Sequence, residues 1–321
     1  MAQQSYSDVR REVLAIEMRA NPRMVIFTDA FAEDESAERL LKEFGKQRVR
    51  SFERQADMIV GAALGAVLAG CRAVVELGSM STLAGVMGRL SSDAGSRRYC
   101  SGGTATVALT IRAGFFEPDA NAASFAPALE NWLAATPGVL VAAPATLQDA
   151  AGLLRSALRE ENPVVLLEHP AMKNAPAQAP VEEQPVPLGS AALRRSGKDL
   201  TVISYGRMAP TALAACEQVA ADGIEAEMID LRSLKPLDLS TVLESVRKTG
   251  RVLLCSAAPG RSGFISELAM SIIEHGFDDL DAPIRRLCAP EVTAPLSAAL
   301  AAYAVPSQVQ IAEGIRGLAR E

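Results

Sequence analysis

Short apolar runs separated by helical patterns dominate this chain and constrain its fold most. In the first half, the stretches at 54 to 70, 81 to 95, 124 to 135 and 146 to 160 carry the periodicity of amphipathic helices. The apolar runs are MVIFTDA (24 to 30), RAVVELG (72 to 78), TVALTIR (106 to 112), GVLVAAP (138 to 144) and PVVLLEH (163 to 169). Strands with so little polar alternation are buried on both faces, as in a parallel sheet. The order predicts a doubly wound α/β domain.

The same alternation resumes after a proline-rich segment. Residues 171 to 189 can form neither a helix nor a central strand, and they predict a linker at 176 to 188. Beyond the linker, strand runs at 199 to 206, 226 to 232, 251 to 257 and 283 to 289 alternate with helical stretches near 210 to 222, 238 to 248 and 264 to 275. We therefore predict two doubly wound α/β domains, at 1 to 175 and 189 to 321.

Composition excludes several classes of function. A chain of 321 residues with 49% hydrophobic content is long enough to bury two cores. Its 32 basic and 38 acidic residues give a net charge of −6, and the basic residues are dispersed, so nucleic acid is not an expected partner. Because no apolar run reaches the roughly 18 residues of a membrane span, we expect a soluble, cytoplasmic protein.

Cysteine, histidine and glycine patterns provide no familiar metal or phosphate site. The cysteines, Cys71, Cys100, Cys216, Cys255 and Cys288, are widely spaced without a CxxC pair, which predicts reduced packing residues. Two histidines are too few for a histidine-rich metal site. Neither a GxxxxGK[ST] loop nor a GxGxxG turn follows a strand, so a bound cofactor diphosphate would have to be held by a partner chain.

Ordered blocks along nearly the whole chain resemble a known family. They include VGAALGAVLAGCRAVVEL (60 to 77), NPVVLLEH (162 to 169), TVISYGRMAPTALAA (201 to 215) and IDLRSLKPLD (229 to 238). This order is similar to the beta subunit of thiamine-diphosphate-dependent 2-oxo acid dehydrogenases, which include the pyruvate, branched-chain and acetoin enzymes. The resemblance implies a pyrimidine-binding domain followed by a transketolase C-terminal domain.

The same resemblance implies partners and cofactors. It points to an alpha subunit that binds thiamine diphosphate and Mg²⁺, an α2β2 assembly with active sites at the subunit interfaces, and an acyltransferase component as a further partner. The small-molecule substrate would be a 2-oxo acid, decarboxylated with transfer of an acyl or aldehyde group.

The residues that would line the cofactor pocket depart from the family. A glutamate of the beta chain normally contacts the aminopyrimidine in the motif T-P-I-S-E-x-G, and counting back from VGAALG places Ala56 there. By the same comparison, Arg54 replaces an apolar residue, Thr82 an aromatic ring, Gly85 a glutamine and Phe125 the histidine of the H-S-Q element. The resemblance therefore predicts this fold with an altered pyrimidine pocket.

An acidic residue beside Ala56 offers a substitute carboxylate. Spacing of four places Glu53 and Asp57 on one helical stripe with Gly61 and Gly65, about 100° away from Ala56. Asp57 could serve only if the start of the helix slipped by one residue. Alternatively, both acids stabilise the helix amino terminus by about 0.3 to 1 kcal/mol. The two glycines indicate a subunit interface by resemblance, or close packing on the chain's own sheet.

Two further alternatives stay open. The loop REENP (159 to 163) matches a stretch that binds a monovalent cation such as K⁺ in some family members, with Glu160 and Asn162 at the ligand positions; it also reads as a plain helix end. The chain as a whole is either an enzyme subunit or a catalytically inactive structural or regulatory subunit that kept the fold and the interface.

Overall fold

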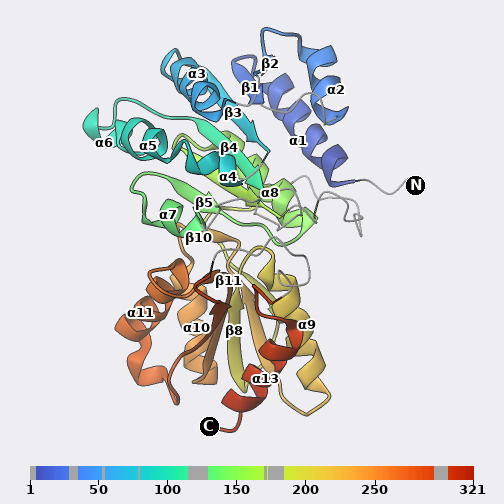
Figure 1. Cartoon of the computed structure of the whole chain (residues 1–321), viewed down its shortest axis with the longest axis vertical. Helices are drawn as coiled ribbons and strands as arrows, with labels where there is room; N and C mark the ends of the chain where they lie inside the picture. The colour runs from blue at the N-terminus through green and yellow to red at the C-terminus, as the bar shows by residue number, and fades with distance from the viewer. Residues whose placement is uncertain are drawn as a thin grey trace. The chain divides into compact units, whose positions relative to one another are not determined.

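A computed structural model describes residues 5–28, 35–52, 55–78, 80–114, 129–169, 172, 184–292 and 303–321 (Figure 1). The chain divides into two compact units. The first comprises residues 1–116 and 132–188, and the second comprises residues 117–131 and 189–321. The linear boundaries at 175 and 188 stay a prediction, and most of the proposed linker lies outside the described residues.

The first unit alternates helices and strands, as the sequence predicts. Its elements are α1 (Tyr6–Ala20), β1 (Met24–Thr28), α2 (Glu35–Phe44), β2 (Val49–Ser51), α3 (Ala56–Leu68), β3 (Arg72–Leu77), α4 (Met80–Ala84), α5 (Met87–Arg89), a π-helical turn (Leu90–Gly95), α6 (Arg97–Cys100), β4 (Leu109–Gly114), β5 (Leu140–Ala142), α8 (Leu147–Arg159) and β6 (Val164–Glu168), with α7 (Leu129–Ala135) crossing from the second unit. The predicted strands correspond to β1, β3, β4, β5 and β6.

Strands of the first unit form a parallel sheet in the order β5-β6-β4-β3-β1-β2. Val74 of β3 joins the core formed with α1 and α8, in which Val13 and Leu154 are also buried. Ala73 and Val75 are buried as well and point to the opposite face by strand alternation, and α3 packs on β3. Helices on both faces explain why these strands are apolar throughout.

Local sequence explains where helices begin and break. Ser5 caps α1, because its hydroxyl accepts a hydrogen bond from the Asp8 amide at 3.2 Å. In turn, the Asp8 carboxylate accepts a hydrogen bond from the Ser5 amide. The single helix predicted at 81 to 95 is instead α4, α5 and the π-helical turn. Gly85 and Gly88 lie in this stretch, and glycine disfavours a continuous helix.

The second unit repeats the α/β pattern. It contains β7 (Ala192–Arg195), β8 (Leu200–Ser204), α9 (Met208–Ala220), β9 (Ala226–Asp230), β10 (Ser233–Lys235), α10 (Leu239–Thr249), β11 (Val252–Pro259), α11 (Phe264–Gly276), a 3-10 turn (Phe277–Asp279), β12 (Arg285–Ala289) and α13 (Gln308–Leu318). Its sheet has the order β12-β11-β8-β9-β7, with β7 antiparallel at the edge. Figure 1 shows α9 and α13 on one side of this sheet and α10 and α11 on the other, which confirms the doubly wound prediction. In the described part of the chain, every helix is too short or too polar to cross a bilayer.

Candidate functional site

The amino end of α3 contains Ala56, the residue to which the sequence resemblance assigns the position of the family glutamate. Ala56 is the first residue of the helix, and Gln55 before it makes no side-chain capping bond. Ala56 is half-buried and its methyl group neither donates nor accepts a hydrogen bond. The helix begins two residues later than the predicted stretch at 54 to 70, and Asp57 is its second residue, one position after Ala56.

Asp57 is instead paired with Arg89, the last residue of α5. Arg89 donates Nη2 to Asp57 Oδ2 at 2.8 Å and Nε to Oδ1, and its Nη1 lies 3.6 Å from Asp93 Oδ2. The hydrogen bonds from Arg89 lower the pKa of Asp57, and Asp57 raises the pKa of Arg89. An ionised carboxylate held in this way is a poor proton donor, and its lone pairs already accept two donors.

Of the other positions predicted to differ from the family, the structure describes Thr82 and Gly85. Thr82 is half-buried in α4, and Gly85 follows the end of that helix in an exposed position. A Cβ added at Gly85 would meet only the Thr82 carbonyl oxygen, at 3.6 Å, so the backbone leaves room for a side chain at this position. Arg54 and Phe125 lie outside the described residues.

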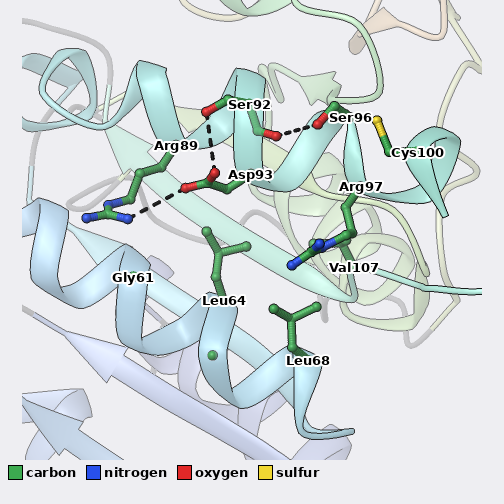
Figure 2. Close-up of a pocket in the computed structure, with 11 residues that line it drawn as sticks. Gly61, Leu64, Leu68, Arg89, Ser92, Asp93, Ser96, Arg97, Cys100 and Val107 are labelled. Carbon is green, nitrogen blue, oxygen red and sulfur yellow. Dashed lines mark hydrogen bonds and ion pairs between the residues drawn. The ribbon is translucent and has the colours of Figure 1, made fainter.

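An open groove runs beside these residues, with a volume of about 480 Å³ (Figure 2). Its apolar lining comes from α3 and the approach to β4, and its polar lining comes from the helical segments between them. The residues are Gly61, Leu64, Gly65, Leu68 and Val107 on the apolar side, and Arg89, Ser92, Asp93, Ser96, Arg97 and Cys100 on the polar side. Figure 2 shows the Arg97 side chain reaching from α6 toward α3.

The glycines of α3 shape this groove. A Cβ at Gly65 would meet nothing within 4 Å, and one at Gly61 would make ordinary contact with the Arg89 guanidinium at 3.6 Å. Leu68 beside them is 52% exposed. The glycines therefore open a shallow apolar face rather than allowing close packing inside this chain, which favours the interface interpretation over the alternative.

A buried charge network lies at the carboxyl ends of neighbouring strands. Arg112 of β4 binds both oxygens of Glu168 on β6, Oε1 at 3.1 Å, and it also binds Glu76 of β3 and the Tyr6 hydroxyl of α1 at 3.2 Å. Burial alone would lower the pKa of Arg112, but the nearby carboxylates hold it well above its ordinary value. Arg10 lies 3.9 Å from Glu76 and balances the charge. The network ties α1 to the sheet.

The proposed cation loop is internally hydrogen-bonded. Glu160 Oε1 accepts from the Asn162 Nδ2 at 2.6 Å and from the amides of Glu161 and Asn162. Arg98 donates to Asn162 Oδ1 at 3.1 Å, and Arg72 donates to the Glu160 carbonyl. Two guanidinium groups thus occupy these oxygens, and the described loop does not fit K⁺ as it stands. Among the described residues, no group of three or more His, Cys, Asp or Glu side chains could hold a metal.

Sequence reasoning did not anticipate Arg89 or the Arg112 network. Glu76, Arg112 and Glu168 were nevertheless visible as charged residues near the carboxyl ends of otherwise apolar strands. Charged residues are almost never fully buried unless paired, so their recurrence in buried strands was a usable signal. Arg89 gave none, because its partner Asp57 is 32 residues away, with β3 and α4 between them in the chain.

Comparison with known proteins covers both units. Residues 2–172 match the family "Transketolase, pyrimidine binding domain", and residues 189–311 match "Transketolase, C-terminal domain". Pyruvate dehydrogenase E1 component subunit beta of Bacillus subtilis is 34% identical over 98% of each chain. The 2-oxoisovalerate dehydrogenase subunit beta of the same organism is 31% identical over 99% of each chain.

A third relative and a solved structure extend the comparison. The subunit beta of acetoin:2,6-dichlorophenolindophenol oxidoreductase from Cupriavidus necator is 35% identical over 80% of this chain and 76% of its own. A chain of a split-gene transketolase, described as an inactive beta4 tetramer, superimposes with a TM-score of 0.82 over 99% of both chains at 18% identity, which shows a shared fold. The chain belongs to the family of 2-oxo acid dehydrogenase beta subunits, built from the two transketolase domains.

Proposed function

We propose that this chain is the beta-type subunit of a heteromeric thiamine-diphosphate-dependent enzyme that decarboxylates a 2-oxo acid and transfers the acyl or aldehyde group. The observation that carries the proposal is full-length similarity to a pyruvate dehydrogenase beta subunit, 34% identity over 98% of each chain. The proposed location is the cytoplasm.

The chain's own residues do not fit the usual activation of the cofactor. At the start of α3, Ala56 offers no carboxylate and Asp57 is occupied by Arg89. We therefore assign thiamine diphosphate and Mg²⁺ mainly to an alpha subunit. Of the residues proposed around the pyrimidine, Arg54, Ala56, Thr82, Gly85 and Phe125, none is a carboxylate.

The partner is proposed to pack on the groove beside α3. Gly61 and Gly65 leave the helix backbone accessible, with apolar Leu64 and Leu68 beside them. Such a surface lets a second helix approach closely and bury apolar area. We propose an α2β2 assembly with an alpha-type subunit on this face, and an acyltransferase component as a further partner.

A catalytically inactive structural or regulatory subunit is the second candidate. The Arg89 to Asp57 pair favours it, because it neutralises an acid that lies beside the altered position. In this case the chain would keep the groove and the assembly while contributing no chemistry.

One experiment separates the candidates. The chain is co-expressed with an alpha-type subunit, the complex is purified, and thiamine diphosphate with Mg²⁺ is titrated by calorimetry into the complex and into each subunit alone. The enzyme proposal expects cofactor binding by the complex and release of CO₂ from a 2-oxo acid. A stable complex that binds no cofactor would establish the inactive subunit, and absence of any complex would contradict both.

A further inference from the structure

The short segment that begins α7 is embedded in the second unit. Glu130 is only 4% exposed, although glutamate is almost always solvent-exposed unless it is paired. The next residue, Asn131, accepts a hydrogen bond through Oδ1 from the Phe264 amide at 2.9 Å. Both residues belong to the second unit by their contacts, although most of that unit is formed by residues 189–321.

Asn131 caps a helix that has no cap of its own. Helix α11 begins at Phe264, and Gly263 before it provides no side-chain hydrogen bond. A Cβ at Gly263 would lie 2.9 Å from Asn131 Nδ2 and 2.7 Å from the Pro259 carbonyl oxygen, so glycine is needed for this approach. The asparagine therefore satisfies one of the amides that a helix amino terminus leaves unpaired.

Glu130 lies near a buried aromatic cluster where β8 and β11 end. Tyr205 follows β8, shares a 2.9 Å hydrogen bond between its hydroxyl and Ser256 Oγ of β11, and packs edge-on to Phe264 with 5.7 Å between ring centroids. In open α/β sheets, the carboxyl ends of the strands form the crevice that usually receives ligands. Here the chain places its own Glu130 beside that edge.

The surroundings favour a neutral Glu130. Burial raises the pKa of Glu130 to about 7, and its own amide and Arg207, at the start of α9, only partly oppose this shift. Burial and the nearby Glu130 raise the pKa of Tyr205 well above its ordinary value, and Cys288 of β12 adds to that effect. Arg207 is thus the charged group, and Tyr205 the titratable group, that interact electrostatically with Glu130.

We propose that residues 129–131 form a proton-dependent latch: protonated Glu130 allows the segment to dock on the second unit, and ionisation of Glu130 releases it together with the Asn131 cap on α11. The step is one proton lost to solvent for each latch that opens, with no covalent change. It is independent of whether the enzyme proposal holds, because it involves no cofactor or partner.

Hydrogen exchange of the Phe264 amide in the full-length chain tests the latch. After correction for the intrinsic exchange rate, the opening equilibrium constant should rise by up to about tenfold for each pH unit between the ordinary glutamate pKa of 4.5 and about 7, because opening releases one proton in this range, and it should level off above about 7. Glu130→Gln should remove this pH dependence and keep the amide protected. Glu161→Gln, which changes an exposed glutamate, should leave the dependence unchanged.

A second variant separates the latch from the cap. Asn131→Ala should weaken protection of the Phe264 amide at every pH and remove its pH dependence, because this amide then has no cap to lose when the segment is released. Infrared spectra of the unmodified chain at about pH 6 should contain a protonated carboxyl band that disappears as the pH is raised through about 7. Protection that does not change with pH, or a pH dependence that survives in Glu130→Gln, would overturn the proposal; the infrared band decides the matter if that variant does not fold.

Discussion

Arg89 holds Asp57 at the first turn of α3, with Arg89 Nη2 2.8 Å from Asp57 Oδ2. The pair joins two segments that are distant in sequence and fixes the charge state of an acid immediately after Ala56. Its first consequence is electrostatic and can be measured without a cofactor.

Removing the guanidinium should raise the pKa of Asp57. Because Arg89 lowers this pKa in the folded chain, any stabilisation by the pair is present above the ordinary value near 3.8 and is lost as the pH falls through the folded pKa. Arg89→Gln should shift the Asp57 titration, followed by carboxyl NMR, to higher pH. Arg97→Gln serves as the control in the same groove and should leave the titration unchanged.

In the complex with an alpha-type subunit, Asp57→Asn should leave cofactor-dependent turnover nearly unchanged. The reason is that Asp57 already accepts two hydrogen bonds from Arg89 and does not occupy the family position. A loss of turnover comparable to that from removing a general base, roughly 10²- to 10⁴-fold, would identify Asp57 as the substitute carboxylate after all.

Placing a carboxylate at position 56 should increase turnover. Ala56→Glu introduces a carboxylate at the helix start, and turnover by the complex should increase, by up to roughly 10²- to 10⁴-fold if general acid-base assistance is fully recovered. Gln55→Glu, one position earlier, controls for added negative charge. Equal responses of the two variants would show that charge rather than position is responsible.

The exposed glycine of α3 offers a test of the proposed interface. Gly65→Leu should weaken association with the alpha-type subunit by about tenfold or more, equivalent to about 1.4 kcal/mol, because the side chain would occupy the groove. The isolated chain should stay folded, since a Cβ at this position meets nothing within 4 Å. Gly88→Leu, at another helical glycine without neighbours, should bind normally; sedimentation of the mixed subunits measures both.

The Arg112 network predicts a large effect on stability. Arg112→Met leaves Glu76 and Glu168 buried without their partner and should destabilise the first unit by about 3 to 5 kcal/mol. Tyr6→Phe removes the hydrogen bonds of the phenolic hydroxyl with Arg112 and Glu168 and should cost about 1 kcal/mol for each. Urea unfolding monitored in the first unit distinguishes the two, and similar small losses would mean that the network is not energetically connected.

Much of the architecture was predictable from local sequence. Apolar runs such as 72 to 78 and 251 to 257 became β3 and β11, because a strand covered on both faces needs apolar side chains at every position. The helical stretch predicted at 54 to 70 became α3, although the helix begins only at Ala56. The helix predicted at 81 to 95 is instead three short helical segments, because Gly85 and Gly88 disfavour a continuous helix.

The two α/β units and the family resemblance could be predicted from the sequence alone, because each depends on residue type and order along the chain. Only the tertiary structure decided that Asp57 pairs with Arg89, that Arg98 and Arg72 occupy the oxygens of the 160 to 162 loop, and that Asn131 caps α11. These contacts join side chains dozens of residues apart. Their formation depends on how helices and strands pack in space, which local periodicity does not encode.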